Sequence, residues 1–141
     1  HYPLRRQRQM CIRDSGAHNP LDELYPVTHG ERITELIDVV GSVYVADVVK
    51  DYLVNIVAAT RSHDAVRLGA SPRASLHLIR TARAKAALAG RDYVIPDDVQ
   101  AMAIPVLAHR LLPSTRAQLD GISPVDIVSQ ILTSTPVPEQ A

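Results

Sequence analysis

Residues 69–88 read GASPRASLHLIRTARAKAAL, and they combine a helix start with an apolar line along one helix face. Ser71 suits the N-cap of a helix, and Pro72 suits the first helical position, where a missing N–H costs nothing. Small or apolar residues then recur along one line, at Ala74, Leu78, Ala82 and Ala86. Gly90 is a typical residue to end such a helix. The pattern predicts an alanine-rich helix over residues 72–88.

Four other stretches carry apolar residues at helical spacing. The first, residues 28–41, opens with Thr28 and Glu31 at the spacing of a capping box. The others are residues 47–63, 96–107 and 123–132. Pro105 lies inside the third of these four stretches, and it predicts a kink or an early end there.

Two short stretches, residues 43–45 and 93–95, have extended or β-prone character. The connections between the predicted helices are short. The sequence therefore predicts an all-α fold, a small bundle of about five helices with one or two very short extended segments.

The length and composition exclude several classes of protein. A chain of 141 residues with 46% hydrophobic residues corresponds to one globular domain. No apolar run reaches the roughly 20 residues that span a bilayer, and no secretory signal is visible, so we expect a cytoplasmic protein without membrane contact. A lone Cys11 and six scattered histidines predict no metal site. No glycine-rich phosphate loop occurs.

The net charge is zero, but the charges are unevenly distributed. Residues 61–91 hold seven basic residues and only Asp64 as an acid. Residues 16–60 and 92–141 are both net acidic. This distribution predicts a local anion-facing surface rather than a general affinity for polyanions.

Arg73 violates a local rule, because a cation in the first turn of a helix opposes the helix dipole. The same position favours an anion, since free N–H groups are available there. One interpretation is that Arg73 reaches a phosphate on another domain; the other is a solvated arginine that neutralises a neighbouring carboxylate. Asp97 and Asp98 could be taken for a catalytic pair, but first-turn acids are more typical of capping.

Several segments together resemble the C-terminal lid domain of MoxR-type AAA+ ATPases. They are IVAATR at 56–61, VRLGASPRA at 66–74, GRDYV at 90–94, PDDV at 96–99 and VLAHRL at 106–111. NPLD at 19–22 and Pro26-Val27 resemble the segment that links the ATPase core to the lid. The resemblance covers roughly residues 17–138 and rests chiefly on the GASPRA motif.

The resemblance implies a small helical lid that follows a P-loop domain. Arg73 would be the sensor 2 arginine, which contacts the γ-phosphate region of ATP and couples hydrolysis to lid movement. Ser71, Pro72 and Ala74 would share the nucleotide-facing start of the helix. ATP and Mg²⁺ would bind through the P-loop domain, and the resemblance leaves open whether Arg73 serves its own subunit's nucleotide or its neighbour's. Such proteins form rings, expected to be hexamers, and act as chaperones, often for clients with von Willebrand factor A domains.

The resemblance also suggests a domain organisation for an N-terminally truncated fragment. Residues 1–15 would be a sequencing or vector artefact or a disordered arm, and residues 16–27 a linker from the P-loop domain. Residues 28–134 would form the lid, and residues 135–141 a disordered tail. Walker A and Walker B motifs are absent, so we expect the chain alone to be inactive as an ATPase.

Two alternatives belong to other classes. A basic helical module could bind nucleic acid through the helix that carries Arg73 and Lys85. The acidic flanks and the lack of clear helix-turn-helix spacing disfavour it. A structural interaction bundle would give Arg73 no functional role.

Overall fold

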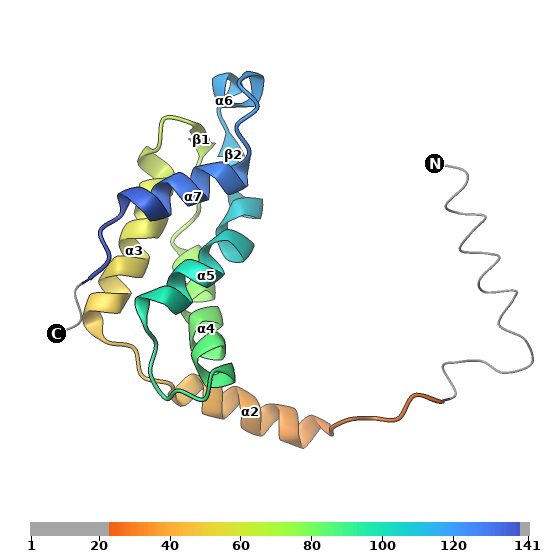
Figure 1. Cartoon of the computed structure of the whole chain (residues 1–141). Helices are drawn as coiled ribbons and strands as arrows, with labels where there is room; N and C mark the ends of the chain where they lie inside the picture. Colours follow the sequence, from red (N-terminus) through yellow and green to blue (C-terminus); the bar gives the residue numbers. More distant parts are fainter. Residues whose placement is uncertain (1–22, 139–141) are drawn as a thin grey trace, which may run out of the picture. The chain divides into compact units, whose positions relative to one another are not determined.

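The structure is a computed structural model that describes residues 23–138 (Figure 1). It divides into two compact units, His1–Thr34 and Glu35–Ala141, and the boundary falls within helix α2, Gly30–Ser42. Predictions for residues 1–22 and 139–141, including the proposed arm at 1–15 and Cys11, lie outside the described residues.

Helices dominate the second unit, which confirms the all-α prediction. Its further elements are α3 (Asp47–Ser62), β1 (Val66–Leu68), α4 (Arg73–Leu88), α5 (Pro96–Leu107), the 3₁₀ helix η2 (Ala108–Arg110), β2 (Leu112–Pro113), α6 (Thr115–Leu119) and α7 (Pro124–Ser134). No helix among residues 23–138 is both long enough and apolar enough to cross a membrane.

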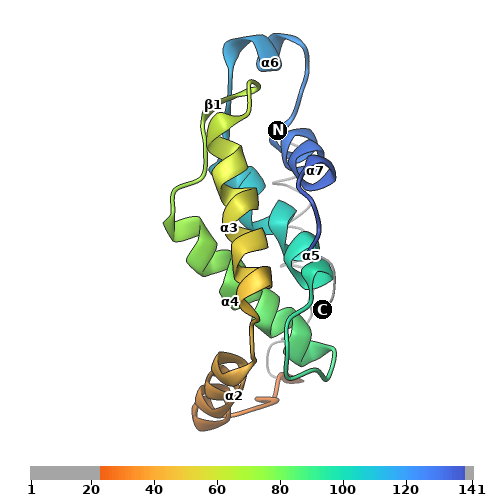
Figure 2. The ribbon, with the colours of Figure 1, turned by 90° about the vertical axis from the view of Figure 1, so that its left-hand side faces the viewer.

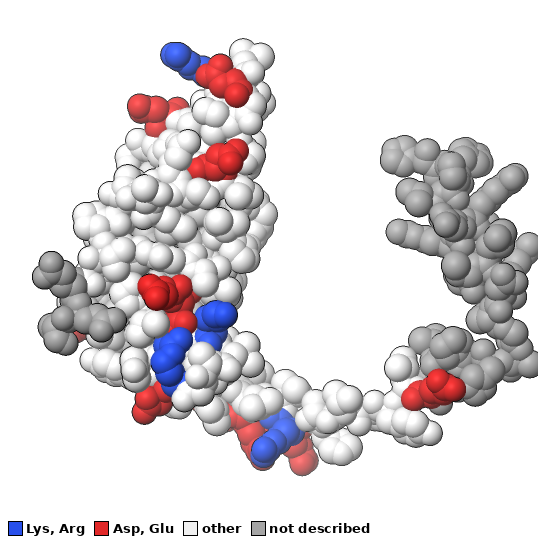
Figure 3. Space-filling view, viewed as in Figure 1, with Lys and Arg blue, Asp and Glu red and all other residues white. Residues whose placement is uncertain are grey.

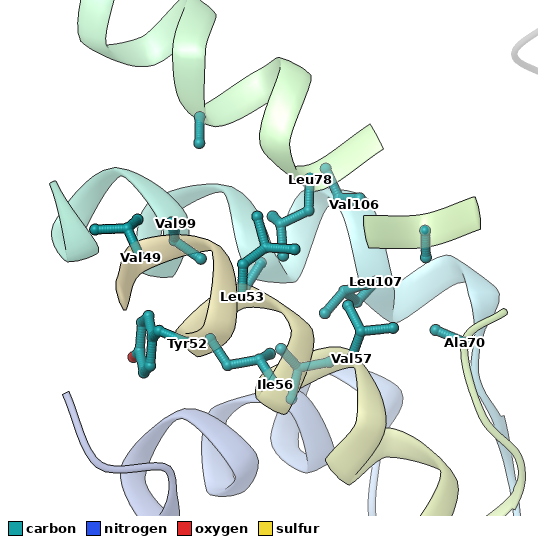
Figure 4. Close-up of a cluster of buried hydrophobic side chains, with 14 of the residues drawn as sticks. Val49, Tyr52, Leu53, Ile56, Val57, Ala70, Leu78, Val99, Val106 and Leu107 are labelled. Carbon is teal, nitrogen blue, oxygen red and sulfur yellow. The ribbon is translucent and has the colours of Figure 1, made fainter. Parts of the chain in front are cut away.

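One hydrophobic core joins α3, α4, α5 and α7 (Figures 1 and 2). The predicted line on α4 is fully buried: Ala74, Leu78, Ala82 and Ala86. Because three of these four side chains are single methyl groups, α4 can approach its neighbours closely. From α3, Leu53, Ile56 and Val57 enter the same core (Figure 4). This packing makes the path of α4 a property of the whole unit.

The extended segments are as short as the sequence predicts. Tyr44 and Tyr93 form an isolated parallel bridge, in which the Tyr44 N–H donates to the Asp92 carbonyl over 2.8 Å and the Val94 N–H to the Tyr44 carbonyl over 2.9 Å. β1 and β2 form an antiparallel pair with Val66 opposite Pro113 and an irregularity in register. The first pairing joins the two stretches predicted to be extended.

Two helix starts differ from the predictions, Pro105 does not end its helix early, and one short helix was not predicted. α2 begins at Gly30, one residue later than a Thr28 cap would place it. α4 begins at Arg73, although Pro72 already has helical φ and ψ of −55° and −27°. α5 continues through Pro105 to Leu107, the predicted end; the hydrogen bond that Pro105 removes is offset by the burial of Val106 and Leu107 in the core. The sequence did not predict α6, a helix of five residues.

Candidate functional site

Arg73 opens α4 and its side chain is exposed. Within residues 23–138 its guanidinium makes no hydrogen bond or ion pair. The described part of the chain therefore supplies no carboxylate that Arg73 neutralises. The residue is a free cation at the start of a helix.

The other three predicted site residues surround Arg73 but have different environments. Ser71 and Pro72 are exposed, whereas Ala74 is fully buried in the core. The Ala74 N–H donates to the Ser71 carbonyl over 2.8 Å, and the Ser75 N–H to the Pro72 carbonyl over 3.1 Å. Two early N–H groups are thus used inside the first turn. The Arg73 side chain is the main group that this helix start offers to an anion.

Thr60, in the last turn of α3, contacts the loop that leads to Arg73. Its hydroxyl donates to the Val57 carbonyl over 2.6 Å and accepts a hydrogen bond from the Ala70 N–H over 3.0 Å. Thr60 is completely buried, so water does not compete with either bond. The hydroxyl therefore ties the end of α3 to the backbone three residues before Arg73.

Gly69 allows this close approach. A Cβ at Gly69 would lie 2.6 Å from the Thr60 carbonyl oxygen and 2.8 Å from the Arg61 Cα. Both distances are shorter than any ordinary contact, and both partners are backbone atoms. Glycine is required here because there is no space for a side chain.

Ala70 is held on three sides. Its N–H bonds to Thr60, and its carbonyl accepts a bond of 3.3 Å from Nη1 of Arg61. Its methyl group is buried on the side of the core where Val57 and Leu107 lie (Figure 4). Figure 2 shows the chain running back from β1 beside α3 to the start of α4. We call Thr60, Arg61, Gly69 and Ala70 the α3–α4 brace.

A second set of contacts fixes the other end of α4. Gly90, with φ of +73°, follows the helix, and the Arg91 N–H donates to the Ala86 carbonyl over 3.0 Å. Arg91 then forms two bonds of 2.7 Å with the carboxylate of Asp98. Asp98 also accepts the Ile95 N–H over 3.0 Å. Burial alone would raise the pKa of Asp98, but the bonds from Arg91 and from the Ile95 N–H lower it.

This geometry gives Asp98 the capping role that the sequence favoured, while Asp97 is exposed. The apolar side chain of Ile95, at the N-cap position, cannot accept a hydrogen bond from the first turn of α5. On that ground alone, a poorly defined start of α5 would be expected. Asp98 replaces that cap from within the first turn. Nothing in the sequence pattern pointed to its partner Arg91.

The other basic side chains of residues 61–91 differ in how accessible they are to a ligand. Arg80 is exposed, but Arg83 is half-buried and its Nε has no hydrogen-bond partner. On the face in Figure 3, charged side chains leave a broad uncharged area over the middle of α5 and α7. Within residues 23–138, no group of three or more His, Cys, Asp or Glu residues could hold a metal ion.

The mainly helical unit with its tiny two-stranded sheet has the architecture of a small helical lid domain. The family model described as AAA lid domain matches residues 58–131, and the chain belongs to this family. Its similarity to proteins named MoxR makes it a lid of the MoxR type.

Similarity to individual proteins extends over most of the chain. The uncharacterized protein YeaC of Bacillus subtilis is 42% identical over 122 residues, which cover 86% of this chain and 38% of YeaC. Chaperone MoxR1 of Mycobacterium tuberculosis is 37% identical over 116 residues, covering 76% of this chain and 31% of that protein. A crystal structure from Cytophaga hutchinsonii, of a protein assigned as an ATPase, matches 95% of this chain and 43% of its own with a TM-score of 0.80 and 25% identity. The chain thus spans well under half the length of these proteins.

Proposed function

We propose that Arg73 is the sensor 2 arginine of this lid, and that it binds the γ-phosphate region of ATP held by a P-loop domain. The observation that carries the proposal is the exposed guanidinium with no partner among the described residues, at the first position of α4. Phosphoryl transfer is accelerated mainly by positioning and by cations that stabilise spread negative charge. A free arginine at a fixed place suits that task.

The residues present fit part of a nucleotide site. Arg73 can meet phosphate oxygens, and α4 carries four basic residues and no acidic one. Among residues 23–138, no group of three or more His, Cys, Asp or Glu side chains could hold a metal ion. We therefore place Mg²⁺ and most of the phosphate contacts on the P-loop domain. ATP bound there supplies the phosphoryl group that is transferred to water. This chain supplies the cation that binds its outer phosphate and the helix that carries the cation.

Coupling to lid movement follows from how α4 is held. The α3–α4 brace fixes its start, and the Arg91–Asp98 pair fixes its end against α5. The whole line of buried residues on α4 lies in the core. A force on Arg73 is therefore transmitted to the bundle as a whole rather than absorbed by one helix.

The wider assembly is part of the same proposal. In it, residues 16–27 link the P-loop domain to a lid of residues 28–134, and residues 135–141 form the tail. The full protein forms a ring, expected to be a hexamer, acts as a cytoplasmic chaperone, and has von Willebrand factor A domain proteins as clients. The chaperone part of this proposal is supported by the similarity to a protein named Chaperone MoxR1.

The alternative of a nucleic-acid-binding module would use α4, the helix that carries Arg73 and Lys85. Arg61 and Arg91 flank this helix in the basic segment and are engaged elsewhere, because Arg91 is paired with Asp98 and Arg61 donates to the Ala70 carbonyl. The segment as a whole therefore presents fewer free cations than its composition indicates.

The experiment that tests the proposal is ATP turnover by the full protein, with this lid joined to its P-loop domain. Arg73→Ala is compared with Arg80→Ala, which removes another exposed arginine from the same helix, two turns away. Loss of turnover in the first variant alone supports the sensor 2 role.

A further inference from the structure

We propose that Thr60 is a positioning residue for Arg73, acting through its hydrogen bond to the Ala70 N–H. The proposal rests on the proposed function, because it concerns the same arginine. It adds that the direction of the Arg73 side chain is set from α3, ten residues earlier in the chain than Ala70.

The fully buried Ala74 anchors α4 directly after Arg73, and the bond from Thr60 to the Ala70 N–H anchors the chain before it. No side chain caps α4, and the first N–H bonds run only to the Ser71 and Pro72 carbonyls inside the same turn. Between β1 and α4 the chain has no regular structure. The nearest fixed point before Arg73 is Ala70, and Thr60 holds its N–H.

The bond is specific as well as buried. The Thr60 hydroxyl has no exposed surface and uses both its hydrogen and a lone pair. Loss of the hydroxyl would leave the buried Ala70 N–H without an acceptor, which favours a shifted loop. The loop backbone at Gly69 already lies directly against the Thr60 carbonyl. The loop therefore cannot move closer to α3 when the hydroxyl is lost, and any shift moves it away from α3.

A small shift of the loop matters for catalysis. Arg73 lies three residues after Ala70, so a shift of the loop acts on the first residue of α4. Misplacement of a charge-stabilising group by about 1 Å can cost up to about a hundredfold in rate. We therefore expect Thr60 to affect turnover through Arg73 rather than through stability alone.

The test uses the full protein with its P-loop domain. Thr60→Val keeps the shape of the side chain and removes the hydroxyl. We expect kcat for ATP to fall about tenfold or more, with KM within about threefold, because the contact counts most in the transition state. Thr60→Ser restores the hydroxyl and should recover most of the activity.

Thr81→Val is the matched control. The Thr81 side chain is half-buried, and its hydroxyl donates only to the His77 and Leu78 carbonyls within α4. Its loss should leave kcat unchanged within about twofold. A similar fall in kcat for Thr81→Val and Thr60→Val would overturn the proposal.

The decisive arm repeats Thr60→Val in the Arg73→Ala background. If Thr60 acts through Arg73, the second change adds nothing to the first. If Thr60→Val lowers turnover by the same factor in both backgrounds, Thr60 acts independently and the inference is wrong. Normal turnover of Thr60→Val beside an impaired Arg73→Ala overturns this inference and leaves the proposed function intact. Normal turnover of Arg73→Ala overturns both.

A second variant covers a failure of Thr60→Val to fold. Arg61→Ala removes the exposed arm of the brace, the bond of 3.3 Å to the Ala70 carbonyl. It should lower kcat in the wild-type background and not in the Arg73→Ala background. An unchanged kcat for a folded Arg61→Ala would then contradict the brace.

Discussion

Arg91 and Asp98 form a two-pronged ion pair, with Nη1–Oδ2 and Nη2–Oδ1 distances of 2.7 Å. Arg91 also donates to the Tyr93 carbonyl over 3.0 Å, and its guanidinium lies 5.9 Å from the centre of the Tyr93 ring. Asp98 is 3% exposed. The pair closes the turn between α4 and α5 and satisfies the buried carboxylate at the start of α5.

Asp98→Ala should destabilise the bundle. It leaves the Arg91 guanidinium and the Ile95 N–H without their acceptor, which corresponds to about 1–3 kcal/mol of unfolding free energy. Asp97→Ala removes an exposed neighbour and should stay within about 0.5 kcal/mol. Urea denaturation measures both. Equal midpoints for the two variants would contradict a structural role for the pair.

The same pair predicts how stability depends on pH. The pKa of Asp98 is lowered in the folded state, so its contribution is fully present above the unfolded pKa of about 3.9 and is lost as the pH falls through the folded value. The difference in stability between wild type and Asp98→Ala should therefore be constant near neutrality and shrink below about pH 4. Denaturation at a series of pH values measures it. A difference that stays constant down to about pH 2.5 would argue against the ion pair.

The start of α7 offers a prediction independent of the proposed site. The Ser123 hydroxyl accepts the Asp126 N–H over 3.2 Å, while Asp126 accepts the Ser123 N–H over 2.9 Å. Ser123→Ala removes the cap and should cost about 1 kcal/mol. Ser129→Ala, which removes an exposed hydroxyl from the helix interior, is the control and should have little effect. Thermal unfolding distinguishes the two, and an unchanged midpoint for Ser123→Ala would contradict the capping box.

Two glycines should respond in opposite directions to alanine. Gly69→Ala places a methyl group against backbone atoms of Thr60 and Arg61 and should destabilise the fold by about 1–3 kcal/mol. Gly41→Ala, within α2 and with nothing within 4 Å of the new atom, should stabilise by up to about 1 kcal/mol. Denaturation of both variants is the measurement. A neutral Gly69→Ala would mean that the loop does not lie against α3.

The sequence predicted the helices whose signals are local. The apolar stripe of α3, apart from the exposed Val48, and the line from Ala74 to Ala86 are buried as expected, because periodicity indicates which face packs. The same periodicity in α2 is not matched by burial, since no residue of that helix is buried. The α6 helix was missed because five residues carry too little periodic signal. The start of α4 was predicted to within one residue, because proline marks helix starts, but the predicted Ser71 cap is wrong: the helix begins at Arg73 and no side chain caps it.

The contacts that hold Arg73 in place could not be predicted in the same way. The Thr60–Ala70 bond depends on how the chain folds back after β1, and no spacing rule covers that return. Gly69 is required because a side chain would clash with the backbone of Thr60 and Arg61, and not because of a positive φ. The sequence alone could not show this requirement, since the clash depends on which residues lie against the loop. The Arg91–Asp98 pair spans a turn between two helices, where helical spacing no longer applies.

The sensor 2 role of Arg73 is tested by ATP turnover of the full protein, with wild type compared with Arg73→Ala and with Arg80→Ala as control. We expect kcat to fall by about one to three orders of magnitude in Arg73→Ala, as when a charge-stabilising cation is removed, and to stay within about twofold in Arg80→Ala. Unchanged turnover in a folded, assembled Arg73→Ala protein would contradict the sensor 2 role and leave the chain a structural lid.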